Sequence, residues 1–509
     1  MQQLSRQQRR SEELKRNKQA RREARRALRQ RQAAEGLLPP PRATIENGKS
    51  AWKTVEEEKQ ARQETTEEQL RVYRSMLPRL LKRLAKIPDP RNPLLIRHKL
   101  TALLLYGILM FVYQMTSRRE ANREMSLPQF WENLQLLFPE LESLPHQDTL
   151  ARLLARIEGD KIQESLLASV EELIRNKKFS RYLISHCYPI AIDGTGKLKR
   201  NYLWAEQCLE RQVQTTAGTE PQYYAYVLEA KLVFSNGMTI PLLCEFLDYG
   251  EGDQQRNKQD CELNAFYRLA ARVKKNFPRL PILLLLDGLY ASGPVAELCR
   301  HDHWEFMIVL QDESLTSVWE EFRGLRQLER QNHLERKWGN RKQRFRWVNG
   351  IEYRYGEGER KKQILHVVVC EESWEELDAN SPAVVSKTAR HAWISSVPLN
   401  RDNVHERCNL GARHRWGIEE GILVEKHQGY GYEHGFSYNW EAMRGYHFLM
   451  QIARLLNVLV EYSAHLVRMV RRWGLRGLVQ FLRTTCSGPW LDAPRLRQIL
   501  ASPCQIRLE

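Results

Sequence analysis

Two aspartates in this sequence each follow a short apolar run and precede a glycine. Residues 282–286 are five apolar residues that lead into Asp287, and residues 188–192 lead into Asp193. Runs of this kind predict strands that are buried on both faces. Because burial of an unpaired carboxylate is costly, we expect both aspartates at the carboxyl edge of a sheet, where active sites open. The alternative is that Asp287 only caps the turn that follows it.

A third carboxylate, Glu419, lies in a helical segment rich in charge. Arg415 precedes it by four residues, so the two side chains are neighbours on a helix. Three carboxylates from distant parts of one sheet-based core indicate metal chemistry, since Mg²⁺ prefers oxygen ligands. A pair of Mg²⁺ ions, with Mn²⁺ as a substitute, activates water or a 3′-hydroxyl in phosphodiester cleavage. We expect Asp193 to bridge both ions, Asp287 to hold one and Glu419 the other.

Five strands and two helices must position the first two acids. The hydrophobic pattern predicts three strands, a helix, a strand, a helix and a strand, in that order. They cover residues 188–196, 224–234, 238–247, 257–276, 282–287, 293–301 and 306–310, with a Ser235-Asn236-Gly237 turn in the hairpin. This is the order of a ribonuclease H-like core. The predicted fold class is therefore α/β, a mixed-sheet core of this kind with a β-rich insertion and helical regions at both ends.

The insertion, residues 312–390, is basic and aromatic and rich in predicted strands. Trp338, Arg344, Arg346 and Trp347 recur along it. Aromatic and arginine side chains that alternate on a ribbon suit stacking on unpaired bases and contact with phosphates. They suit a half-exposed sheet equally well. We take these four as candidate DNA-binding residues and keep the structural alternative open.

The overall charge favours a polyanionic partner. The 509-residue chain has 79 Lys and Arg against 62 Asp and Glu, a net charge of +17, and a pI of about 9.4. Nucleic acid is the first expectation and an anionic membrane the second. About half of the excess lies in residues 1–32, where twelve Lys or Arg face three Glu. This tail shows no apolar stripe that could pack, so we expect solvated helix or disorder that adds phosphate contacts, or only a solubilising role.

The cysteines and the apolar segments indicate the cellular compartment of the protein. Nine cysteines stand far apart without a C-x-x-C pair, which argues against a disulfide framework or a zinc ribbon and favours a reducing cytoplasm. The N-terminus is charged where a signal peptide needs an apolar core. The most apolar window, residues 103–113, is too short to span a bilayer and predicts a core helix. No membrane anchor is expected.

Helical patterns flank the core. Short helices in residues 51–180 form either a helix-turn-helix-like DNA-binding unit or an ordinary bundle. Pro78 is expected to kink or divide the first of them, and a loop is expected around Trp490 and Pro494. The predicted domains are a basic tail and linker (1–50), a helical DNA-binding domain (51–180), the first part of the core (181–311), the insertion (312–390), the second part of the core (391–436) and a C-terminal helical region (437–509).

In these motifs the chain resembles the DDE transposases of bacterial insertion sequences, and among them the group with a Tyr-Arg-Glu-Lys signature. That signature places two residues between Tyr and Arg, three between Arg and Glu, and six between Glu and Lys. Arg415, Glu419 and Lys426 occupy their places, and Ala412 stands where Tyr is usual. The Trp-x-Ile-Glu frame and the Lys spacing favour Glu419 over Glu420 and Glu425 as the third acid.

Other parts of the chain carry the same resemblance. Asp193-Gly194-Thr195, the apolar run into Asp287 and the segment 258–263 also fit, so that it covers residues 190–435. It implies that Arg415 and Lys426 grip phosphates beside the scissile bond. It also implies that a tryptophan of the insertion, Trp338 or Trp347, holds a flipped base.

The function that the resemblance implies is DNA transposition. Such an enzyme cuts double-stranded DNA at terminal inverted repeats and joins the 3′-hydroxyl to target DNA, acting as a homodimer in a synaptic complex. The setting would be the nucleoid in a bacterial cytoplasm. Two alternatives remain: a non-catalytic DNA-binding protein derived from a transposase, and a ribonuclease H-like nuclease or resolvase.

Overall fold

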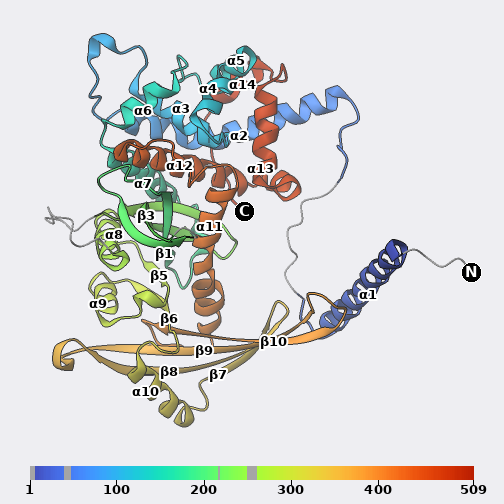
Figure 1. Ribbon diagram of the computed structural model, residues 1–509, viewed down its shortest axis with the longest axis vertical. Coiled ribbons are helices and arrows are strands. Elements are labelled where there is room, and N and C mark those ends of the chain that lie inside the picture. Colours follow the sequence, from blue (N-terminus) through green and yellow to red (C-terminus); the bar gives the residue numbers. More distant parts are fainter. Residues whose placement is uncertain (1–5, 39–47, 216–217, 249–260) are drawn as a thin grey trace, which may run out of the picture. The chain divides into compact units, whose positions relative to one another are not determined.

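A computed structural model of the protein describes residues 6–38, 48–215, 218–248 and 261–509 and divides the chain into two compact units. We call Met1–Ala43 with Leu283–Ala412 the β-rich unit, and Thr44–Ile282 with Arg413–Glu509 the helical unit. Figure 1 follows the chain through both by colour. Most of the expected linker lies outside the described residues, as do the first three residues of the segment 258–263.

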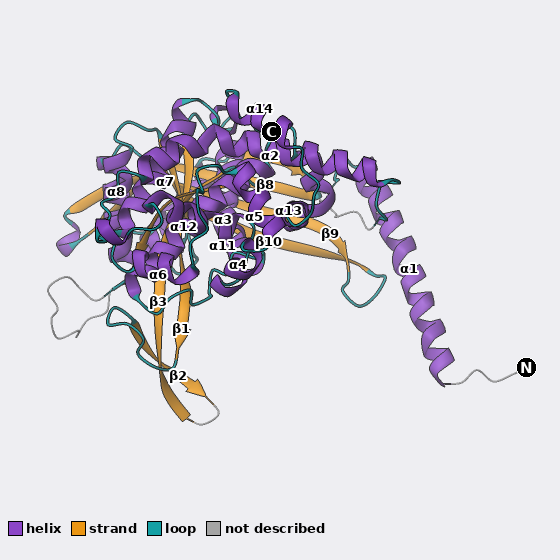
Figure 2. Ribbon diagram, turned by 90° about the horizontal axis from the view of Figure 1, so that it is seen from above, coloured by secondary structure: helices purple, strands orange, loops and turns teal. Residues whose placement is uncertain are grey.

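An antiparallel sheet forms the centre of the helical unit. Strand β3 (Gly218–Val233) pairs with β1 (Tyr188–Arg200) along one edge and with β2 (Leu209–Thr215) and β4 (Thr239–Phe246) along the other. The expected turn joins β3 to β4, and its Gly237 has a φ of +90°, which glycine adopts without strain. In Figure 2 the outer parts of β1 and β3 run with β2 away from the helices of this unit.

Helices cover both faces of this sheet. Successive side chains of a strand point to opposite faces, so Cys244 and Glu245 of β4 mark the two sides. Arg268 and Arg272 of α8 (Glu262–Asn276) pair with Glu245, at 2.8 and 2.9 Å. On the Cys244 side lie α7 (Gly159–Arg175), α11 (Trp416–His427) and α12 (Trp440–Glu461).

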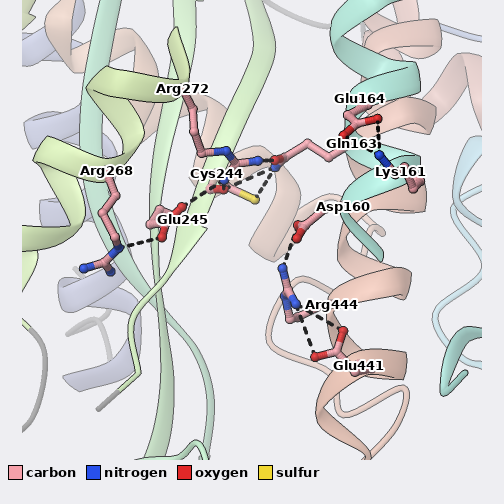
Figure 3. A network of polar contacts seen from close by, with 10 residues as sticks. All are labelled: Asp160, Lys161, Gln163, Glu164, Cys244, Glu245, Arg268, Arg272, Glu441 and Arg444. Carbon is pink, nitrogen blue, oxygen red and sulfur yellow. Dashed lines mark hydrogen bonds and ion pairs between the residues drawn. The ribbon is translucent and has the colours of Figure 1, made fainter. Parts of the chain in front are cut away.

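Polar contacts tie these helices to the sheet edge (Figure 3). Arg272 donates to the Cys244 carbonyl at 3.0 Å and also to Gln163 of α7, so that one guanidinium joins α8, β4 and α7. Arg444 of α12 pairs with Asp160 of α7 at 2.7 Å. The helices therefore hold fixed positions around β4.

The other helices of the unit form a bundle. They are α2 (Val55–Leu84), α3 (Leu100–Val112), α4 (Arg118–Met125), α5 (Pro128–Leu137), α6 (Gln147–Leu154), α13 (Val467–Cys486) and α14 (Ala493–Ala501). Thr54 caps α2 by accepting from Glu57 N, and three glutamates in its first turn favour this end. In α3 every residue but one is buried, which confirms the core helix expected from its apolar sequence.

The β-rich unit contains a large mixed sheet in the order β5-β6-β10-β9-β8-β7. The strands are β5 (Ile282–Leu286, whose first residue belongs to the helical unit), β6 (Glu305–Val309), β7 (His333–Trp338), β8 (Arg341–Tyr355), β9 (Lys361–Leu377) and β10 (Val384–Ser395). Only the β5–β6 pair is parallel, and the other pairs are antiparallel. Helices α9 (Gly293–His301) and α10 (Thr316–Leu328) connect the strands. With helical regions toward both ends of the chain, the protein is of the α/β class.

The N-terminal helix α1 (Arg6–Ala34) is part of the β-rich unit and packs on β9. Leu28 and Leu37 are buried, and Gln32 Nε2 donates to the Glu375 carbonyl at 3.0 Å. The tail is helical, which is one of the two states expected, and it packs on β9 through a leucine and a glutamine although it has no apolar stripe.

Two other expectations differ from the structure in part. Of the two effects expected of Pro78, division of the helix is absent, because α2 continues through this residue. The segment expected as a loop contains α14, where Asp492 accepts from Arg495 N at 3.0 Å and Pro494 stands in the first turn, which tolerates proline. Among the described helices, none is long and apolar enough to cross a membrane.

Candidate active site and nucleic-acid interface

Asp193 lies half-buried in β1, at the register position opposite Glu229 of β3. The glycine that follows it is required by its neighbours. A Cβ at Gly194 would lie 2.6 Å from the ring of Tyr226 and 2.7 Å from Glu262 Oε2. The glycine thus has a local cause: Tyr226 and Glu262 closely cover the face of β1 to which residue 194 points, opposite to the face of Asp193.

Glu262 is the carboxylate that the sequence did not single out. It is the first residue of α8, and its Oε2 accepts from the Tyr226 hydroxyl at 3.0 Å. Burial, together with Glu262 and Asp193, raises the pKa of Tyr226, so this hydroxyl keeps its proton. The sequence marks Glu262 only as a residue near a helix start, and its place beside Gly194 comes from the fold.

Glu419 lies outside the buried side of α11 and pairs with Arg415. Arg415 Nη2 donates to Glu419 Oε1 at 2.9 Å, as the four-residue spacing predicts, and the side chains are 8% and 37% exposed. The Arg415 Nε and Nη1 atoms are buried and have no hydrogen-bond partner among the described residues. Buried donors without acceptors cost about 1–3 kcal/mol, so Arg415 is suited to receive an anion.

The other acids of this segment have different surroundings. Glu425 is buried against Lys231, with Oε1 2.7 Å from Nζ. Glu420 is exposed at the surface. Lys426 pairs with Glu433 at 2.9 Å and lies over the ring of Tyr432. Glu425 therefore has a structural partner, while Glu419 is accessible.

The contacts of α11 with the sheet show where Glu419 lies along the direction of the strands. Gly417 and Gly421 lie against Val233 and Thr239, next to the start of β1, while Glu425 reaches Lys231 and the level of Glu229. Asp193 shares the level of Glu229. Glu419 is six residues before Glu425, about 9 Å along the helix axis. The structure therefore places Asp193 on the sheet and Glu419 on the helix that packs against it, at different levels along the strands.

Asp287 follows β5 and belongs to the β-rich unit. Its Oδ1 accepts from Leu289 N at 2.9 Å and caps the short turn Gly288–Tyr290. The capping role weighed from the sequence is thus present, and it uses one carboxylate oxygen. Among the described residues, no group of three or more His, Cys, Asp or Glu side chains is gathered in a way that could hold a metal ion. The three-acid site stays a prediction.

The four candidate residues of the insertion lie on opposite faces of the β7–β10 sheet. Trp347 is 3% exposed and packs in its core face, whereas Arg344 and Arg346 lie on the exposed face. Trp338 is half-buried at the end of β7. Arg344 pairs with Glu371 at 2.7 Å. The alternation therefore serves partly as ordinary sheet packing, with the tryptophan inward and the arginines outward.

Two adjoining hollows follow the exposed face. One, of about 800 Å³, crosses β7 to β10, and the other, of about 440 Å³, lies between β7, β8 and the end of α10; both are lined by Glu335 and Arg344. The cations that line them are Arg326, Arg330, Arg336, Lys337, Lys342, Arg344, Arg346 and Arg390. We call this surface the basic groove. The eight cations outnumber the four acids that also line the hollows, Glu329, Glu335, Glu371 and Glu372, and this excess of positive charge suits a phosphate backbone.

A buried network of charges holds α11 against the sheet. Lys231 Nζ lies 2.7 Å from both Glu229 and Glu425, and none of the three side chains is more than 2% exposed. Although burial opposes its charge, the two carboxylates raise the pKa of Lys231. The Tyr432 hydroxyl donates to Glu229 at 2.6 Å, and Gln451 of α12 donates to Glu425 at 3.2 Å. The network connects β3, α11 and α12.

One comparison with known proteins bears on the helical unit. A family model described as DDE_Tnp_1-associated matches residues 81–169, from the end of α2 into α7. The match relates this helical region to DDE-type transposases. No curated protein matches the chain.

Substitution of Lys231 tests the network. Lys231→Met leaves two like charges buried together, so we expect the free energy of unfolding to fall by about 3–5 kcal/mol. The matched control is Lys161→Met, which removes a surface pair with Glu164 at 3.0 Å and should change the stability much less, because water screens an exposed pair. Urea unfolding measures both. Equal losses of stability in the two variants would show that breaking the buried ion pairs costs no more than breaking a surface pair.

Burial of His447 predicts a loss of stability in acid. Burial, with Lys197, Lys231 and Arg444 nearby, holds the pKa of His447 well below its usual value. The unfolded chain takes up this proton below about pH 6.5 and the folded chain does not, so stability decreases as the pH falls, by up to about 1.4 kcal/mol per pH unit. Between pH 7 and pH 5 the unaltered protein should lose more stability than His447→Gln. Parallel curves of unfolding free energy against pH would contradict this.

Proposed function

We propose that this protein is a DNA transposase of the DDE type, with a ribonuclease H-like catalytic core. It would cleave phosphodiester bonds at transposon ends and transfer the 3′-hydroxyl into target DNA. The observation that carries the proposal is the match of residues 81–169 to a domain associated with such transposases. The acids, the basic groove and the buried arginine of α11 supply what that chemistry needs.

The residues that would hold the metal ions are Asp193, Asp287 and Glu419. Their chemistry fits, because all three offer carboxylate oxygens, which are the ligands that Mg²⁺ and Mn²⁺ accept. The accessible side chain of Glu419 and the hydrogen bond that Asp287 accepts through Oδ1 alone, as far as the described residues go, are compatible with this role. Bound Mg²⁺ would supply charge stabilisation at the attacked phosphate. Asp193 and Glu419 must approach one another when metal and DNA bind, since they start at different levels of the sheet.

Arg415 would hold the phosphate beside the bond that is cut. Its Nε and Nη1 donors are buried and have no partner among the described residues, and Nη2 is fixed by Glu419. These two donors lie on different edges of the guanidinium, so a phosphate would take one of them rather than both. A phosphate bound there would lie next to Glu419. Lys426 would contribute after exchanging Glu433 for a phosphate.

The basic groove would hold the DNA backbone through Arg344 and Arg346. Both side chains lie on the exposed face, where the neighbouring cations continue the same surface. Trp338 is the better placed of the two tryptophans to meet an unpaired base, because Trp347 is buried. The partner would be double-stranded DNA, both terminal inverted repeats and target, with two copies of the chain in a synaptic complex. A DNA substrate of this kind implies work at the nucleoid.

Substitution of the acids tests the catalytic proposal. Asp193→Asn, Asp287→Asn and Glu419→Gln should each reduce Mg²⁺-dependent nicking of DNA with terminal inverted repeats by at least about a thousandfold, because each removes a charged metal ligand. DNA binding, measured by gel shift, should persist. The matched control is Glu420→Gln, the exposed neighbour on the same helix, which should cut at the normal rate.

The outcomes separate the proposed function from its alternatives. Full cutting by any one of the three variants would remove that residue from the site. Binding without any metal-dependent cutting by the unaltered protein would favour the non-catalytic DNA-binding protein. Cutting without joining of the 3′-hydroxyl would favour a nuclease or resolvase.

A further inference from the structure

The N-terminal helix has two distinct faces, one packed against β9 and one exposed and cationic. With 3.6 residues per turn, Arg21, Ala24, Leu28 and Gln32 fall on one side of α1. This side contacts the end of β9: Arg21 Nη2 donates to the Asp378 carbonyl at 3.2 Å, and Gln32 donates to the Glu375 carbonyl. We call these four residues the anchor face. They are the least exposed part of the second half of the helix.

Contacts just beyond the helix complete the attachment. Lys342 Nζ lies 2.9 Å from Glu35 Oε2, Lys337 donates to the Glu35 carbonyl, and Arg31 pairs with Glu375. Leu37 is buried beside them. Both lysines also line the basic groove. The helix is thus attached at the rim of that groove, in the same unit of the protein.

A separate face of α1 carries half of its twelve Lys and Arg residues. Lys15, Lys18, Arg22, Arg25, Arg26 and Arg29 project within an arc of about 100° and are all exposed. We call these six residues the cationic stripe. It lies roughly a quarter-turn from the anchor face, and it runs for about 21 Å along the helix axis. The glutamates of the helix, Glu12, Glu13 and Glu23, fall outside the arc.

We propose that the cationic stripe binds the phosphate backbone of duplex DNA, with the anchor face fixing its direction. The inference rests on the proposed function, because it takes DNA as the partner. The charge is what selects this occupant: six cations in one line, without an acid among them, match a linear polyanion. A solubilising tail needs charge in any arrangement, and it needs neither an anchor nor the clearing of acids from one side. Duplex DNA presents charge along about 21 Å over roughly six base pairs.

The test compares equal losses of charge on and off the stripe. Arg22→Gln with Arg26→Gln removes two stripe cations, and Arg10→Gln with Arg16→Gln removes two exposed cations outside it. Dissociation constants for a duplex carrying the terminal repeat are measured by fluorescence anisotropy from 50 to 300 mM salt. The stripe variant should lower the slope of log K against log salt by about 1.8 and weaken binding at 100 mM salt at least about tenfold. The control variant should change both much less, and equal effects would overturn the proposal.

A second variant examines the anchor. Leu28→Glu keeps all six stripe cations but puts a charge where the helix meets β9. Because a detached helix no longer holds the stripe in a fixed direction, binding should weaken to a similar extent. Unchanged binding by Leu28→Glu would overturn the anchored arrangement.

Failure here is distinguishable from failure of the proposed function. Deletion of residues 1–27 removes five of the six stripe cations and leaves Asp193, Asp287 and Glu419 in place. At saturating DNA this variant should still nick in Mg²⁺, which shows that the stripe serves binding. If the unaltered protein binds through the stripe and never cuts, the catalytic proposal is wrong and the stripe stands.

Discussion

The buried charges of Lys231, Glu229 and Glu425 are the constraint on which the helical unit depends. Side chains that are at most 2% exposed pay the full desolvation of their charges, so the pairs add little net stability beside an apolar core. Separation of the pairs is a different matter, because it leaves a charge alone in the interior. The network therefore specifies where α11 lies on β3 more than it stabilises the contact. A helix held by apolar side chains alone could slide by a turn at lower cost.

That register has a consequence for the acids. As long as Glu425 stays with Lys231, α11 keeps its level, and Glu419 stays toward the start of β1 while Asp193 lies further along it. An approach of the two carboxylates must then come from side-chain rotation or from bending in the first turns of α11. Those turns contain Gly417 and Gly421, which pack directly against Val233 and Thr239. The two glycines therefore let the first turns of α11 approach the sheet closely.

The sequence could predict the elements whose pattern is local. The apolar run of β5, the apolar α3 and the Asn236-Gly237 turn each carry their own signal, and each is present. The outer strand β2 was missed because its residues are mostly polar and exposed, without the alternation that marks a half-buried strand. The buried network was missed for another reason. Glu229 and Lys231 alternate with apolar residues, as charged residues do on a solvent-exposed sheet face. Their partner Glu425 comes 194 residues after Lys231.

In the candidate site too, short sequence patterns predict some features, whereas others depend on contacts between distant parts of the chain. The four-residue spacing of Arg415 and Glu419 predicted their ion pair, and the run into Asp287 predicted an edge position; the structure has the pair and the strand end. The sequence could not show that Asp287 also caps its turn, since either role needs the same residue at the same place. Nor could it show that Trp347 points inward and Arg346 outward, because alternation gives two faces without saying which one is covered.

In both α1 and α11, helical spacing puts the residues that pack against the rest of the protein on one side and the residues proposed to bind nucleic acid on another. In α11, Ile418, Ile422 and Glu425 form the buried side, and Glu419 stands outside it with an arginine that has spare donors. In α1 the anchor face meets β9, and the cationic stripe lies about a quarter-turn from it. Each attachment includes a polar member, Glu425 in one helix and Gln32 in the other, and a search for apolar residues alone overlooks it. Because a polar attachment has directional bonds, it fixes the rotation of the helix about its own axis. That rotation decides which side chains remain available to a nucleic acid.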